Sequence, residues 1–72
     1  MSLQKSLGRR IRQLREEKGW TQEILAAKTS LAPRHINYLE HGKRWPRPDT
    51  LERLAQGLEV EAMDLFDFRN LG

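Results

Sequence analysis

The segment of residues 21–42, TQEILAAKTSLAPRHINYLEHG, constrains the fold most, because it holds two short helical patterns only three or four residues apart. Thr21 can cap the first helix, and Pro33 suits the first turn of the second. Helices joined by so short a turn can pack steeply if a small residue lies at their crossing, and Ala26 is placed for this. The apolar residues spaced to fill a shared core are Leu25, Leu31, Ile36 and Leu39.

The rest of the chain adds further helical patterns and no strand pattern. Leucine and isoleucine recur at helical spacing over residues 3–18, and Gly19 follows as a stop signal. A loop rich in proline and basic residues leads to Pro48, which starts another helix that Gly57 and the acidic run around Glu59 are expected to end. No stretch alternates polar and apolar residues for long enough to form a strand. We expect one all-α domain spanning residues 1–72, with five helices at about 3–18, 22–28, 33–41, from 48 to about 57–59, and 61–67.

The composition excludes several classes of protein. The chain has 72 residues and no cysteine, so we expect a single domain without disulfides or thiolate metal sites. Its apolar runs are too short for a membrane span or a signal peptide, which predicts a soluble protein of the reducing cytoplasm. Two histidines without carboxylates at ligand spacing indicate no metal site. We therefore expect no enzyme activity, no cofactor and no small-molecule ligand.

The charge is distributed unevenly along the chain. Residues 1–47 hold eleven Lys and Arg against four Glu, a balance of +7. Residues 48–72 hold two Arg against six acidic residues, a balance of −4. This asymmetry favours a polyanion as the partner of the first part, although small helical domains also carry uneven solvated charge.

Five sequence pieces, in this order and spacing, resemble the lambda-repressor-like family of helix-turn-helix proteins, also called the Cro/cI-type or XRE family. They are RQLREEKGW, TQEILA, HINYLEHGKRWP, DTLERLAQGLEV and DLF, and the resemblance as a whole runs from about Leu7 to Phe66. The resemblance implies a compact five-helix domain that binds double-stranded DNA with its third helix in the major groove and regulates transcription. The chain departs from the family pattern at Ser30, where glycine is usual in the turn, at Ile24, which leaves no capping box, and at Ala32, a poor helix cap.

The helix at 33–41 gives the same indication from its own residues. At about 100° per residue, Ile36 and Leu39 define its buried side, and Glu40 lies on the flank next to the core. Arginine can bind guanine, asparagine can bind adenine, and a tyrosine ring can pack on a thymine methyl group. The alternative is an ordinary solvated helix face. The residues opposite the buried side are Arg34, Asn37, Tyr38 and His41.

The resemblance and the helix geometry together predict the DNA contacts. The predicted base-contacting residues are Pro33, Arg34, Asn37 and Tyr38. The predicted phosphate-contacting residues are Thr21, Gln22, His35, His41, Lys43 and Arg44. Gln22 begins a helix, where backbone N–H groups and the helix dipole attract anions. The family also implies a structural ion pair between Arg15 and Glu40, which would hold the recognition helix on the body of the domain; two separate solvent charges are the alternative.

A single recognition helix reads only a few base pairs, so we expect a homodimer that binds two half-sites. The acidic and apolar segment 58–72 is the expected dimerisation segment, and its proposed interface residues are Met63, Phe66, Phe68 and Leu71. These side chains could instead complete the domain's own core. The main alternative function is an antitoxin-like or other protein-interaction module on the same fold, and an RNA-associated adaptor is a more distant one.

Overall fold

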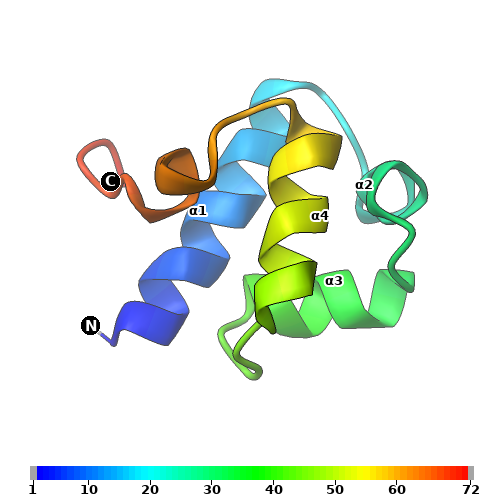
Figure 1. The fold of residues 1–72 in the computed structure, drawn as a ribbon. Coiled ribbons are helices and arrows are strands. Elements are labelled where there is room, and N and C mark those ends of the chain that lie inside the picture. Colours follow the sequence, from blue (N-terminus) through cyan, green and yellow to red (C-terminus); the bar gives the residue numbers. More distant parts are fainter. Residues whose placement is uncertain (1, 72) are drawn as a thin grey trace.

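The computed structural model describes residues 2–71 and contains four α-helices and one short 3₁₀-helix (Figure 1). These are α1 (Leu3–Glu17), α2 (Gln22–Thr29), α3 (Pro33–Glu40), α4 (Pro48–Leu58) and η1 (Ala62–Phe66). The described residues form no strand, so the all-α prediction is confirmed. The prediction of five helices is wrong, because the last segment is a single five-residue 3₁₀-helix. A segment this short gains few α-helical hydrogen bonds for the cost of nucleation, and the backbone is already extended at Asp67.

The helix ends show which local signals set them. Ser30 ends α2 in the left-handed conformation with φ 59°. A serine in this conformation carries a backbone strain that glycine, the usual residue of the family at this position, would avoid. Glu59 takes the same conformation after α4. α4 therefore ends at the acidic run around Glu59, as expected, whereas Gly57, the other predicted end signal, lies in the last turn of the helix. A Cβ atom at Gly57 would come within 2.7 Å of the Thr29 methyl carbon, so glycine is needed there for the close approach of α2.

The helices enclose one core of leucine, isoleucine and alanine side chains. α1 packs against α3 and η1, while α2 packs against α3 and α4. In Figure 1, α2 is seen nearly end-on and α3 runs across the view, so these two helices cross steeply. The buried apolar residues are Leu7, Ile11, Leu14, Leu25, Ala26, Ile36, Leu39, Leu54, Ala55, Leu58 and Leu65. Within residues 2–71, no helix is long and apolar enough to span a lipid bilayer.

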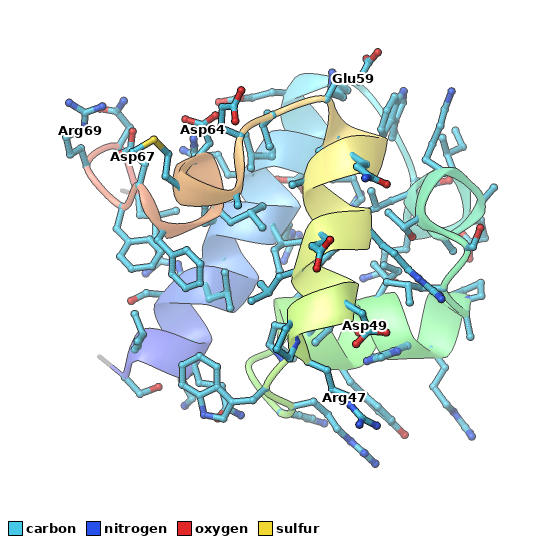
Figure 2. The ribbon with its side chains drawn as sticks, viewed as in Figure 1. Arg47, Asp49, Glu59, Asp64, Asp67 and Arg69 are labelled. Atoms are coloured by element: carbon cyan, nitrogen blue, oxygen red, sulfur yellow. The ribbon has the colours of Figure 1, made fainter. Side chains whose placement is uncertain are left out.

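The C-terminal segment is fastened along α1. Arg10 Nε donates to the Asp64 carbonyl oxygen at 2.8 Å, and Gln13 Nε2 donates to the Asn70 carbonyl oxygen at 2.9 Å. Asp64, Asp67 and Arg69 lie together at this end of the molecule (Figure 2), and hydrogen bonds from Arg69 lower the pKa of the Asp67 carboxyl. Arg10 is therefore engaged in holding the tail against the body of the domain.

Candidate functional site

The outer face of α3 is polar, and its inner face is buried. Ile36 and Leu39 are almost fully buried, as their spacing predicts. Pro33 and Arg34 are exposed at the start of the helix, while Asn37 and Tyr38 are half-buried. The predicted base-contacting residues therefore lie on one accessible helix surface, the recognition face, which we define as Pro33, Arg34, Asn37 and Tyr38.

A basic side chain from the following loop stacks on this face. The guanidinium carbon of Arg44 lies 5.7 Å from the centre of the Tyr38 ring, within the range of a cation–π contact. The two residues line a hollow of about 240 Å³ together with Ala32, Arg34 and His35. The contact brings a cation from beyond α3 to the border of the recognition face.

A buried ion pair fixes the end of α3 to α1. Arg15 Nε and Nη2 donate to the two carboxylate oxygens of Glu40 at 2.7 and 3.0 Å, in a bidentate arrangement. The two residues are only 9% and 6% exposed. Hydrogen bonding to Glu40 raises the pKa of Arg15, and the remaining guanidinium nitrogen, Nη1, donates to the Trp20 carbonyl oxygen at 2.7 Å. The expected structural pair is thus present in the structure as a desolvated, fully engaged contact.

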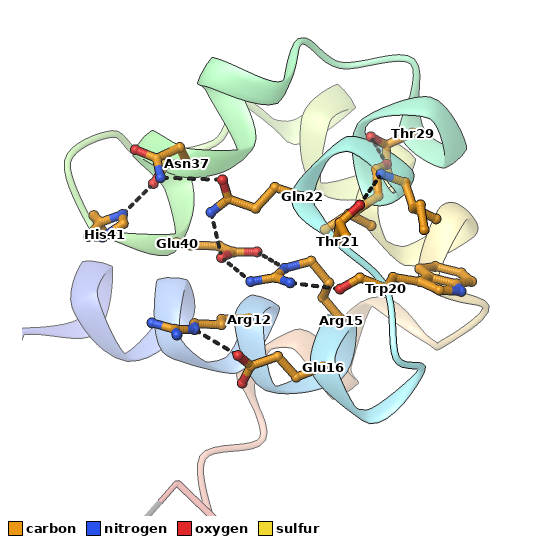
Figure 3. A network of polar contacts seen from close by, with 12 residues as sticks. Arg12, Arg15, Glu16, Trp20, Thr21, Gln22, Thr29, Asn37, Glu40 and His41 are labelled. Carbon is orange, nitrogen blue, oxygen red and sulfur yellow. Dashed lines mark hydrogen bonds and ion pairs between the residues drawn. The ribbon is translucent and has the colours of Figure 1, made fainter.

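The same carboxylate holds Gln22, which the sequence interpretation had assigned only to phosphate. Gln22 Nε2 donates to Glu40 Oε1 at 3.0 Å, and Gln22 Oε1 accepts from Asn37 Nδ2 at 3.4 Å (Figure 3). Gln22 therefore connects the buried ion pair to the recognition face. Spacing along the sequence carried no signal for this link, because it depends on how closely the start of α2 approaches the end of α3.

The other predicted phosphate-contacting residues lie around α3 and differ in how far they are exposed to solvent. Thr21 is exposed and caps α2, because its hydroxyl accepts from the Ile24 N–H at 3.1 Å. His41 Nδ1 lies 2.8 Å from the Asn37 carbonyl oxygen, so its ring is held against its own helix. His35 is half-buried, whereas Lys43 is exposed in the loop after α3. Arg47, a basic residue outside the predicted set, lies where this loop enters α4 (Figure 2).

The proposed dimer residues are exposed to very different degrees. Met63 is 76% and Phe66 is 40% exposed, whereas Phe68 and Leu71 are half-buried. The rings of Phe66 and Phe68 meet edge to face, with centres 6.4 Å apart. Some apolar side chains of this segment belong to the domain's own core, because Leu58 and Leu65 are part of it and Val60 packs against it. Among the described residues, no cluster of three side chains is suited to hold a metal ion.

Comparison with known proteins identifies the motif formed by α2 and α3. The helix-turn-helix family model matches residues 11–65. The uncharacterised HTH-type transcriptional regulator y4dJ of Sinorhizobium fredii is 38% identical over 65 residues, which cover 90% of this chain and 84% of that protein. Control protein C.BamHI of Bacillus amyloliquefaciens is 35% identical over 66 residues, covering 90% and 82%. The crystal structure of the restriction–modification controller protein C.AhdI from Aeromonas hydrophila superposes with a TM-score of 0.83 at 33% identity, covering 85% and 92% of the two chains.

Proposed function

Because this chain belongs to the XRE-type helix-turn-helix family of transcriptional regulators, we propose that it binds specific sites on double-stranded DNA as a homodimer, with α3 in the major groove. The observation that carries the proposal is the recognition face, which is a polar and accessible helix surface. The buried pair of Arg15 and Glu40 holds the end of this helix on α1. Arg34 and Asn37 offer the donors and acceptors that read guanine and adenine. Exposed Lys43 lies just beyond this helix and suits phosphate.

The domain's charge supports a large electrostatic share of the binding free energy. If each subunit neutralises about four phosphates, a dimer should show a log–log dependence of the binding constant on salt with a slope of roughly −7. Titration of a random duplex across a salt series measures this slope. A flat response would contradict DNA binding and favour the protein-interaction module.

We expect residues on α3 to determine which DNA sequence is bound, and residues in the loop after α3 to determine the affinity for any DNA. We expect Arg34→Ala to reduce discrimination between a selected site and a scrambled duplex by about 1–3 kcal/mol, because it loses a bidentate base contact. Lys43→Ala should weaken both duplexes equally, because phosphate contacts do not depend on sequence. Sites selected from random DNA provide the specific duplex. Equal losses on both duplexes for Arg34→Ala would instead assign Arg34 to phosphate.

Dimerisation should depend on the two large apolar side chains left exposed on η1. We expect the double variant Met63→Glu, Phe66→Glu to be monomeric at micromolar concentration, because four charges would then face each other across a two-fold interface. Ile24→Glu is a matched control, since Ile24 is as exposed as Phe66 but lies on α2. Sedimentation equilibrium measures the mass of each variant, and circular dichroism checks the fold. A monomeric parent protein, with and without DNA, would contradict the dimer, and a dimeric double variant would place the interface elsewhere.

A further inference from the structure

The hydrogen bonds between α1, α2 and α3 form a chain with only one possible direction. The ionised carboxylate of Glu40 can only accept hydrogen bonds, and it already accepts two from Arg15. Gln22 must therefore present its amide nitrogen to Glu40, and this orientation turns Gln22 Oε1 toward α3. Asn37 supplies a donor to this oxygen, because its Nδ2 lies 3.4 Å from Gln22 Oε1. The amide orientation of Gln22 thus follows from the buried charge pair, and that of Asn37 follows from Gln22.

This direction decides what Asn37 offers to a ligand. One Nδ2 hydrogen is directed to Gln22, and the other hydrogen remains available. Asn37 Oδ1 accepts no hydrogen bond from the described residues. Asn37 thus presents one acceptor beside one donor. Adenine carries the complementary pair in the major groove, the N6 amino donor beside the N7 acceptor, whereas guanine carries two acceptors.

We propose that Gln22 is a positioning residue for base readout: anchored on Glu40, it sets the Asn37 amide so that Asn37 selects adenine. This inference rests on the proposed function, because it assigns a base preference to α3 in the major groove. It differs from the phosphate role predicted for Gln22, which would set affinity without sequence preference. Figure 3 shows the order of the contacts, from Arg15 through Glu40 and Gln22 to Asn37. The anchor is rigid because the ion pair at its start is desolvated.

The free protein tests the orientation without DNA. In ¹⁵N-labelled full-length protein, the side-chain NH₂ signals of Asn37 should shift when Gln22→Leu removes the acceptor, while those of exposed Gln56 on α4 should not. Unchanged Asn37 signals in a variant with native circular dichroism would overturn the proposed hydrogen-bond chain from Glu40 through Gln22 to Asn37. This measurement stands whether or not the protein binds DNA.

A double-mutant cycle on DNA tests the base preference. Sites are selected from random duplexes with the parent protein, and each base pair of the selected site is then varied. The parent should prefer adenine by about tenfold at one position, which Asn37→Ala abolishes. Gln22→Leu should reduce that preference to about threefold and change other positions by less than about twofold, with no further effect in the Asn37→Ala background.

The outcomes separate the two proposals. If the parent protein selects no DNA site, the proposed function fails together with the base preference. The amide signals alone then show whether Gln22 holds the Asn37 amide. If the parent selects a site but Gln22→Leu weakens every duplex equally, also in the Asn37→Ala background, the proposed function stands and the positioning role is overturned. Because glutamine is uncharged, such a uniform loss with an unchanged salt slope would then assign Gln22 to a phosphate contact.

Discussion

Replacing Glu40 by alanine is expected to lower the free energy of unfolding by about 3–5 kcal/mol, because the Arg15 guanidinium would remain buried without its counter-charge. The Glu40 carboxylate accepts hydrogen bonds from two guanidinium nitrogens of Arg15 and from Gln22. The stability of small domains is only about 5–15 kcal/mol in total, so the loss is a large part of it. Urea unfolding followed by circular dichroism measures the change.

Two further variants identify buried charge as the cause. Glu16→Ala removes the exposed Arg12–Glu16 pair, whose atoms are 3.1 Å apart, and should cost less than about 1 kcal/mol. The double variant Arg15→Met, Glu40→Met replaces both charges with apolar side chains of similar length and should recover most of the stability lost in Glu40→Ala. A double variant as unstable as Glu40→Ala would show that stability depends on the pair itself and not on the uncompensated charge.

Features governed by local backbone and side-chain preferences could be predicted from the sequence. The period of α3 placed Ile36 and Leu39 inside because one helix face alone meets the core. Thr21 was identified as a helix cap because its hydroxyl reaches an N–H only three residues ahead. The family resemblance marked Ser30 as the turn position where glycine is usual, and Ser30 is left-handed in the structure.

Features that depend on the approach of distant segments could not be predicted in this way. Gly57 was interpreted, together with the acidic run around Glu59, as a helix stop, whereas its role is to let Thr29 come close, and no local pattern distinguishes the two roles. The segment 61–67 has helical spacing, but its length and its hydrogen bonds to α1 leave only a 3₁₀-helix. The link from Gln22 to Asn37 joins residues fifteen positions apart, and it exists only because α2 and α3 cross where they do.

Gly8 carries the second large expected effect, because α1 crosses the end of α3 there with no space for a side chain. A Cβ atom at position 8 would clash with the Leu39 carbonyl oxygen and would lie 2.7 Å from the Glu40 carbonyl oxygen. Both are backbone atoms and cannot move aside without shifting α3. In an open helix, Gly→Ala would stabilise by about 1 kcal/mol. We expect Gly8→Ala instead to destabilise by about 2–3 kcal/mol, since overpacking outweighs the gain in helix propensity.

To make room for the alanine in Gly8→Ala, the end of α3 would have to move, and this movement would also affect the recognition face. Moving the end of α3 away from α1 lengthens the contacts between Glu40 and Arg15, so base discrimination should fall together with stability. Ser6→Ala is a suitable control, because it adds helix propensity to the same helix two residues away and removes only a hydroxyl. Thermal unfolding measures both variants, with about 4–8 °C in Tm for each kcal/mol in a domain of this size. A Gly8→Ala protein that melts at or above the parent temperature would mean that α1 and α3 are not in the close contact described, and the rigid base assigned to the recognition face would then lose its support.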